Sequence, residues 1–331
     1  MGQQIYKPKL NFWVVFILLL LFIQLFLIPM GLPKTLTTSI LTMNTIFLSI
    51  IIEALPFVLI GVLIAGFIQI FITENHIRKW IPKNKVMSVI MACIVGALFP
   101  ACECGIVPIV KRLMTKGVPL HAAMGFMLTG PLINPIVILS TYMAFGNNLA
   151  IAGQRMIIGF VLAIVIALIV SVLFKGNQFK QENEVIHTHT TANKTSFFEK
   201  LLNMLKHAID EFFDMGKYLF IGALLAALVQ TYVSTKALLA IGSDVSSSIL
   251  VMMGLAFILS LCSEADAFIA ASFQSLFPTP AILAFLIFGP MIDLKNTIML
   301  CAVFKWKFVA WLVFIISTIV YVSLLLLASY V

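Results

Sequence analysis

The residues best suited to chemistry are two cysteines flanking a glutamate, Cys102, Glu103 and Cys104, in a run that continues Gly-Ile-Val-Pro108. Residues two apart in an α-helix point about 200° apart, so a regular helix would turn the two thiols away from each other. Nearby prolines and a glycine disfavour a regular helix, and an extended or turned backbone lets both sulfur atoms face one cavity. Because paired thiolates favour soft ions, we predict a solute or metal site at Cys102 and Cys104. The alternative is that both are small buried hydrophobic residues.

Acidic residues also interrupt the apolar stretches. An acid at the bilayer centre costs about 2.5–3.5 kcal/mol on insertion scales, so such residues usually face a cavity or a partner and mark ion or proton pathways. The alternative is a set of structural ion pairs with Lys217, Lys295 or Arg155. Asp266 belongs to the acidic set but, like Asp293, is more open to that alternative. The acids predicted to bind solute or ion are Glu53, Glu103, Asp214, Glu264 and Asp293.

A third motif would interrupt helices. It reads Thr129-Gly-Pro-Leu-Ile-Asn-Pro135, and Gly289-Pro-Met-Ile-Asp293 resembles it. Two prolines four residues apart break a helix, and the freed carbonyl groups can coordinate a cation or hydrogen-bond a solute. We therefore predict a binding role for Asn134; the alternative is a proline kink with no such role.

Membrane helices must position these residues. Hydrophobic residues make up 62% of the 331 residues and charged residues 10%, whereas soluble domains carry about 25% charged residues. Apolar stretches recur that are long enough to cross a hydrocarbon core of about 30 Å. The first follows two lysines but is too long for a signal peptide, so we predict an uncleaved helix. The apolar segments are 11–30, 38–72, 86–110, 118–145, 149–174, 208–233, 249–275, 280–302 and 304–330.

The charge distribution indicates the compartment and the partners. The net charge is +8, and the basic residues gather in short polar loops, as the positive-inside rule predicts for cytoplasmic loops. Nucleic acid is not an expected partner, because no soluble basic domain exists to bind it. The five cysteines lie in or beside apolar segments, which is a poor framework for disulfides. We expect a multi-pass protein of a bacterial cell membrane that meets the lipid bilayer and a small solute or ion, without a cofactor.

The chain divides into two related halves. Three correspondences occur in order at an offset of roughly 160 residues, which predicts an internal duplication of a kind common in transporters. Because the Cys102-Glu-Cys104 motif has a counterpart in the second half, the predicted binding site also includes Cys262 and Glu264. The matched pairs are Glu53 to Gly61 with Asp214 to Gly222, Cys102-Glu-Cys104 with Cys262-Ser-Glu264, and Gly130-Pro with Gly289-Pro. The predicted parts are an N-terminal tail with an extra transmembrane helix (1–37), a first repeat (38–174), a cytoplasmic polar linker (175–206) and a second repeat (207–331).

Loop charges predict the topology. The loops 74–85 and 111–116 are both basic, and they would lie on opposite faces if 86–110 crossed the membrane. A re-entrant hairpin at 86–110 removes the conflict, and its counterpart is 249–275. We therefore predict an all-α polytopic membrane protein with about seven spanning helices and two re-entrant hairpins, which makes the halves inverted. The alternative has eight to nine full spans, with parallel repeats when all nine cross.

With these motifs the sequence resembles a family of predicted permeases that includes YraQ and the ArsP organoarsenical efflux permeases. The resemblance rests on Pro100-Ala-Cys-Glu-Cys-Gly-Ile-Val-Pro108 and Gly130-Pro-Leu-Ile-Asn-Pro135, and it runs from about Ile50 to the C-terminus. In ArsP-type members the clustered cysteines are understood to bind trivalent arsenic, which implies that role for Cys102 and Cys104. Glu103 replaces the small polar residue that arsenical permeases tend to have. The Cys-Glu-Cys-Gly form is similar to a subgroup thought to act with a second membrane protein, which implies a membrane partner subunit.

Motifs and resemblance together favour a non-enzymatic permease. We expect a secondary transporter for a small thiophilic or metal-linked solute, with Glu53, Glu264 or Asp214 relaying a coupling ion such as a proton. The sequence has no Gly-x-x-x-x-Gly-Lys-Ser/Thr motif, so ATP would require another subunit. One alternative is a non-transporting subunit that stabilises a partner complex. Another is a membrane thiol oxidoreductase that uses Cys102 and Cys104 as a redox pair.

Overall fold

The computed structural model describes residues 34–73, 77, 80–99, 102–176, 178–180, 197–232 and 244–329. The predicted first transmembrane segment, 11–30, and most of the predicted linker lie outside the described residues.

Within the described ranges the chain forms twelve α-helices and no β-strand. This confirms the predicted all-α class. The helices are α2 (Lys34–Phe71), α4 (Lys85–Leu98), α5 (Glu103–Thr115), α6 (Leu120–Ile133), α7 (Pro135–Ala144), α8 (Leu149–Leu173), α9 (Phe197–Tyr232), α11 (Val245–Leu259), α12 (Ser263–Ser272), α13 (Thr279–Met291), α14 (Leu294–Val303) and α15 (Trp306–Ala328).

Six described stretches are long and apolar enough to cross a membrane, which confirms a polytopic membrane protein. Four are single helices, α2, α8, α9 and α15. The other two are formed by helices in succession, α6 with α7 and α13 with α14. Two further apolar helices, α4 and α11, have 14 and 15 residues and are too short to cross a hydrocarbon core on their own.

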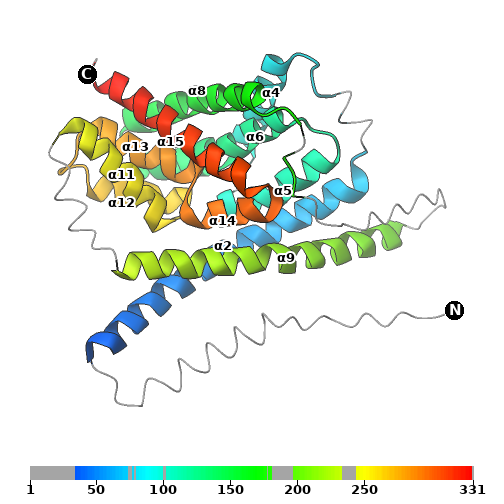
Figure 1. Ribbon diagram of the computed structural model, residues 1–331, viewed down its shortest axis with the longest axis horizontal. Coiled ribbons are helices and arrows are strands. Elements are labelled where there is room, and N and C mark those ends of the chain that lie inside the picture. Colours follow the sequence, from blue (N-terminus) through cyan, green and yellow to red (C-terminus); the bar gives the residue numbers. More distant parts are fainter. Residues whose placement is uncertain are drawn as a thin grey trace.

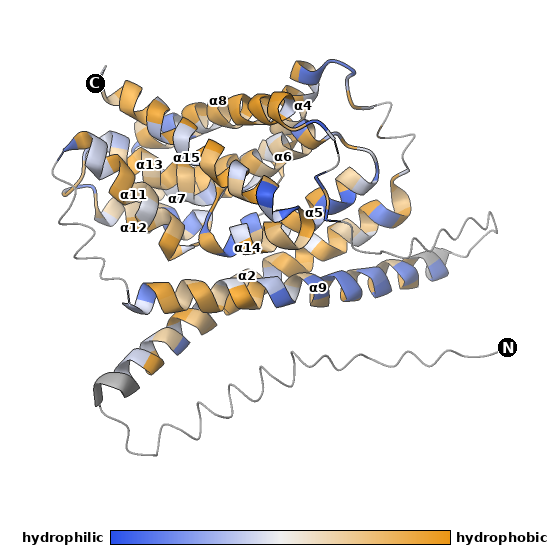
Figure 2. Cartoon of the chain, viewed as in Figure 1, coloured by the Kyte–Doolittle hydropathy of each residue, from blue (hydrophilic) through white to orange (hydrophobic). Residues whose placement is uncertain are grey.

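The helices are arranged in three layers (Figure 1). Helices α2 and α9 pack side by side along one face, where the rings of Phe47 and Phe220 meet edge to face at 4.9 Å. Helix α8 lies along the opposite side, with shorter helices between it and the α2–α9 pair, and α15 runs diagonally from that side across the short helices to α14. Figure 2 shows hydrophobic residues over α8 and α15, while hydrophilic residues gather on the first half of α9 and on the loops at that end. This distribution suits a protein whose long sides face lipid.

Helices α6 and α13 form the centre. About 80% of the apolar window of each broken span is buried inside the protein (78% and 83%), against 33% for each of the other four candidate spans. Polar residues at the interruptions of these two spans are therefore shielded from lipid.

Helices α4 and α5 turn back inside the protein. Lys85 at the start of α4 lies within electrostatic reach of His121 at the start of α6, and a side chain added at Gly96 would clash with Thr129, deep in α6. After the break, α5 returns: the Lys116 ammonium donates to the carbonyl oxygen of Gln69, at the end of α2, at 2.8 Å. Both ends of the pair thus lie at one end of the molecule, at the right in Figure 1, as the predicted hairpin at 86–110 requires.

The pair α11 and α12 has the opposite orientation. Figure 1 shows both helices leaving from and returning to the left end of the molecule. The order in each half is therefore a long helix, two short helices around a break, a broken span and a straight span. That order is compatible with the predicted duplication and inversion, and the duplication itself stays a prediction.

Candidate functional site

Two breaks in the first half follow from local sequence. Proline disfavours the helical conformation in the residue before it, and both Phe99 and Asn134 precede a proline. Phe99 ends α4 with φ −89° and ψ 118°, and Asn134 separates α6 from α7 with φ −65° and ψ 155°. The backbone is also extended at Cys102, from which α5 begins. Helix α6 continues through Pro131, so the interruption lies at Asn134 and Pro135.

The second half breaks at corresponding places with other residues. Ser260 ends α11 in the left-handed conformation (φ 46°), which side-chain-bearing residues rarely adopt. Cys262 is extended and is the N-cap of α12, and the extended Asp293 is the N-cap of α14.

The breaks bring three thiols together. The Cys102 side chain is within hydrogen-bonding range of both Cys104 and Cys262, and all three residues are at least 94% buried. Cys102 and Cys104 come from the first half and Cys262 from the second. No disulfide is present among the five cysteines. In the described part of the chain, no three His, Cys, Asp or Glu side chains already adopt an arrangement that would hold a metal ion.

Lys295 connects the charged groups beside these thiols. Its ammonium lies 3.4 Å from Glu103 Oε1 and 3.6 Å from Asp293 Oδ2, and it donates to the carbonyl oxygen of Ser260 at 3.1 Å. Lys295, Glu103 and Asp293 are each at most 3% exposed. A carboxylate from the first half and one from the second therefore share a cation.

Asn134 and Asp293 act as helix caps. Asn134 Oδ1 accepts from the Val137 amide at 2.9 Å, and Asp293 Oδ1 accepts from the Asn296 amide at 2.5 Å. Asn134 Nδ2 also lies 3.5 Å from the carbonyl oxygen of Gly130, which the break would otherwise leave without its helical partner. Their solute-binding roles stay predictions.

A second buried cation joins the halves. The Arg155 guanidinium on α8 donates to Thr141 Oγ1 at 2.6 Å and to the carbonyl oxygen of Ser263 at 3.2 Å. It also attracts Asp266 and Glu264 on α12. Glu264 is half-buried, and the Ser263 hydroxyl lies 3.4 Å from its carboxylate.

The thiols, acids and bases described above form one polar cluster, whose members are Cys102, Glu103, Cys104, Arg155, Cys262, Glu264, Asp266, Asp293 and Lys295. The remaining predicted acids are not part of this cluster. Asp214 is exposed on α9 and forms a 2.7 Å ion pair with Lys217, as the structural alternative expects. Glu53 is half-buried on α2. Their relay roles remain untested predictions.

Sequence reasoning treated two residues of the cluster only as possible ion-pair partners. Lys295 and Arg155 are basic residues inside otherwise apolar segments, and that isolation was the available signal, because an intramembrane charge requires a partner. For the contributions of Thr141, Ser260 and Ser263, the sequence carried no comparable signal.

Three helix beginnings meet at these thiols and at Lys295, those of α5, α12 and α14. A helix N-terminus carries a partial positive charge of roughly half a unit, which stabilises nearby anions. The acids Glu103, Glu264 and Asp266 lie in first turns, and Asp293 is a cap. The helix N-termini therefore offset part of the negative charge that is buried here.

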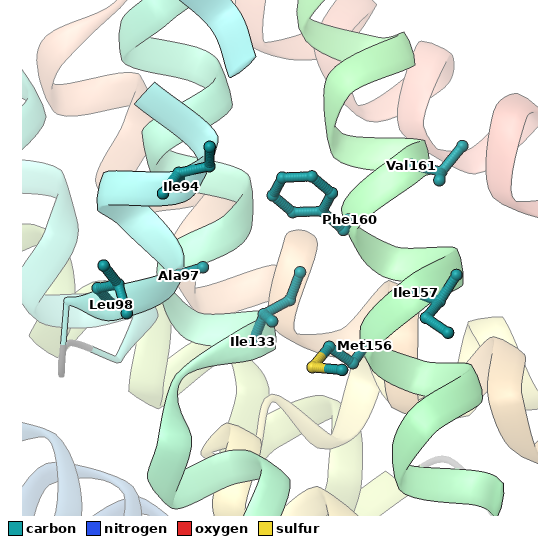
Figure 3. Close-up of a pocket in the computed structure, with 8 residues that line it drawn as sticks. All are labelled: Ile94, Ala97, Leu98, Ile133, Met156, Ile157, Phe160 and Val161. Carbon is teal, nitrogen blue, oxygen red and sulfur yellow. The ribbon is translucent and has the colours of Figure 1, made fainter. Parts of the chain in front are cut away.

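An apolar cavity of about 380 Å³ lies beside the breaks, between α4, α6 and α8 (Figure 3). Leu98, Ile133 and Met156 are among the residues that line it. In the sequence, Leu98 and Ile133 come directly before the two breaks of the first half, and Met156 directly follows Arg155. Because its lining has no polar surface, the cavity is unsuited to a charged solute.

Comparisons with known proteins agree with this architecture. A family model named ArsP_1 and described as predicted permease matches residues 39–330. The chain is 52% identical to the UPF0718 protein YcgR of Bacillus subtilis (strain 168), over 88% of this chain and 99% of the relative. It is 43% identical to a putative two-component membrane permease complex subunit of Streptococcus mutans serotype c, over 85% of this chain and 93% of the relative. No solved structure matches the chain.

Proposed function

Because the chain belongs to the ArsP_1 family of predicted permeases, we propose that it is a secondary transporter of a bacterial cell membrane, and not an enzyme. Its solute binds where the helix breaks of the two halves meet. Interrupted helices with binding groups near mid-membrane are a recurrent transporter design. The bacterial origin of the two relatives supports the location in a bacterial plasma membrane.

The solute is thiophilic, a soft cation or a metalloid-linked molecule. The observation that carries this proposal is the meeting of Cys102, Cys104 and Cys262 at the beginnings of α5 and α12. Sulfur ligands select soft ions over Mg²⁺ or Ca²⁺, which prefer oxygen. A cationic solute would also offset the carboxylates of Glu103 and Asp293, which lie near the same place.

Transport requires contacts between the halves to break and re-form. One set lies at the basic end, which we define by Lys85, Lys111, Arg112 and Lys116. There Arg112 Nε of α5 donates to Glu211 Oε2 of α9 at 2.6 Å, and Lys111 lies 3.3 Å from Glu211 Oε1. Glu211 is only 4% exposed. We propose that these ion pairs hold the basic end closed and separate when the site opens to that side.

Thiol substitution tests the solute site. We expect Cys102→Ser, Cys104→Ser and Cys262→Ser each to reduce uptake of cadmium and of a trivalent phenylarsenical into proteoliposomes by about tenfold or more, since replacing groups around a bound metal commonly costs 10–100-fold. Matched controls exist in Cys93→Ser and Cys301→Ser, whose thiols lie outside the cluster. Uptake that is unchanged in all three site variants would refute the thiol site.

A partner subunit is a finer proposal supported by the name of the Streptococcus mutans relative, a putative two-component membrane permease complex subunit. Flux in liposomes that contain the purified chain alone would establish a self-sufficient permease. Flux in native membrane vesicles but not in those liposomes would support a second required subunit.

The oxidoreductase alternative has a separate readout. All the cysteines are free thiols in this structure. Mass spectrometry after mild oxidation and thiol labelling would reveal a reversible Cys102–Cys104 bond if the pair were redox-active. We expect both thiols to remain labelled.

A further inference from the structure

Asp266 is a buried acid whose carboxylate lacks a hydrogen-bonding partner. It lies on α12, only 1% exposed, and neither of its side-chain oxygens has a hydrogen-bond partner among the described residues. Arg155, which attracts the Asp266 carboxylate electrostatically, directs its terminal nitrogens to Thr141 and to the Ser263 carbonyl instead. A carboxylate removed from water without a hydrogen bond or a paired charge is strongly unfavourable. Asp266 therefore needs an additional positive species or must be neutral.

The charge balance around Asp266 indicates how much positive charge is missing. The buried acids Glu103, Asp266 and Asp293 face two buried bases, Arg155 and Lys295, which leaves one negative charge in excess. The groups that act electrostatically on Asp266 are Glu103 of α5, Arg155 of α8, and Asp293 and Lys295 of α14. Its own helix adds Glu264, which is half-buried, and Cys262. Helices α7 and α13, which also pack against α12, carry no Asp, Glu, Lys, Arg or His.

The geometry favours a proton over a metal ion as the missing charge. A bound Mg²⁺ or Ca²⁺ takes about six or more oxygen ligands. The Asp266 carboxyl packs against α13 so closely that a Cβ atom at Gly289 would lie 2.8 Å from Oδ2. In the described part of the chain no cluster of metal-ligating side chains surrounds it. A proton needs only the carboxyl itself.

We propose that Asp266 is the proton-binding site of this permease and that it exchanges its proton against the solute. This inference rests on the proposed transport function and names its coupling group. Without solute, a proton on Asp266 neutralises the excess charge. When a cationic solute binds, each thiol that forms a bond to it releases its own proton, because the thiolate is the ligand. The positive charge of the solute that the thiolates do not neutralise replaces the proton of Asp266, and its carboxylic acid releases H⁺ to the solution. Arg155 is a positioning residue that stabilises the resulting carboxylate.

Infrared spectroscopy tests the proton site without any solute. In reconstituted wild-type protein at neutral pH we expect the C=O stretching band of a protonated carboxyl group, and we expect Asp266→Asn to remove it. Asp214→Asn is the matched control, because Asp214 is exposed and paired with Lys217; it should leave the band unchanged. Absence of the band in the wild type, or its persistence in Asp266→Asn, overturns the proposal.

Proteoliposomes with a trapped pH dye test the coupling. An inward gradient of cadmium should drive protons outward in the wild type, and Asp266→Asn should lower the number of protons moved per cadmium, because only the protons of the thiols then remain. Exchange of cadmium for cadmium should survive in Asp266→Asn, because it needs no change in protonation. A ratio of protons to cadmium that is the same in Asp266→Asn as in the wild type overturns the coupling. If the wild type moves neither cadmium nor the trivalent phenylarsenical, in these liposomes or in native membrane vesicles, the proposed solute class is wrong, and the infrared result still decides the proton site.

Discussion

The two halves break their helices at corresponding places but fill the breaks with different chemistry. The first break carries two thiols and an acid, Cys102, Cys104 and Glu103. The second carries one thiol, Cys262, and two acids in the first turn of α12, Glu264 and Asp266. Lys295 lies at the later interruption of the second half, at the start of α14. The first half caps its interrupted span with a neutral Asn and the second with an Asp. The halves are thus complementary. The acid of the first break finds its cation only in the second half, 192 residues away in sequence.

This complementarity explains how polar groups can be tolerated at the centre. Within one half, Glu103 would be a buried acid without an ion-pair partner. Joined, the halves place Lys295 between Glu103 and Asp293, and Arg155 of the first half reaches the Ser263 carbonyl of the second. A buried charge is acceptable when it is paired and hydrogen-bonded. The site is therefore a property of the interface between the halves.

Removing the shared cation should break this complementarity most severely. We expect Lys295→Met to destabilise the protein by about 3–5 kcal/mol, because it leaves the buried carboxylates of Glu103 and Asp293 without their ion-pair partner. The measurement is thermal unfolding of the detergent-solubilised protein, followed by size-exclusion chromatography. Adding Glu103→Gln to Lys295→Met should restore part of the loss. An unfolding temperature equal to that of the wild type would contradict the role of Lys295 as the shared cation.

A pair of glycines compares the packing of the two halves directly. A Cβ atom at Gly61 would collide with the backbone of Gly105, whereas one at Gly222, its predicted equivalent, would lie 3.1 Å from the backbone of Lys295. Overpacking costs about 1–3 kcal/mol, so we expect Gly61→Ala to lose stability in that range and Gly222→Ala to lose less. Thermal unfolding of both variants side by side gives the comparison. Equal losses would mean that the halves pack alike at this position.

The smallest expected effect concerns the caps. Asn134→Ala should cost about 1 kcal/mol, because the Val137 amide loses its acceptor. Asp293→Ala should cost more, since it also removes a carboxylate from Lys295. Asp214→Asn serves as the control, because exposed ion pairs contribute about 0–1 kcal/mol. Chemical or thermal denaturation of the three variants would show whether this order holds.

The sequence by itself determined the class of the protein and the two breaks of its first half, and it favoured the hairpin topology over eight to nine full spans. Composition required membrane helices, and prolines after Phe99 and Asn134 set two breaks, because a proline restricts the residue before it regardless of the fold. Loop charges favoured a return of 86–110 to its starting side. The first-half thiols and Glu103 were identifiable because polar residues are rare in apolar segments.

Only the tertiary structure decided which of these residues meet. Lys295 pairs with Glu103, and Arg155 with Ser263, across 192 and 108 positions. Asp214, which the predicted repeat made a candidate, is exposed on α9 and paired with its neighbour Lys217. The physical reason is that membrane helices are apolar on every side, so their sequence does not mark the face that packs inward. The spans formed by α6–α7 and by α8 both qualify as apolar, yet the window of one is 78% buried and that of the other 33%. Packing between helices decides which span is buried, and therefore which residues form the site.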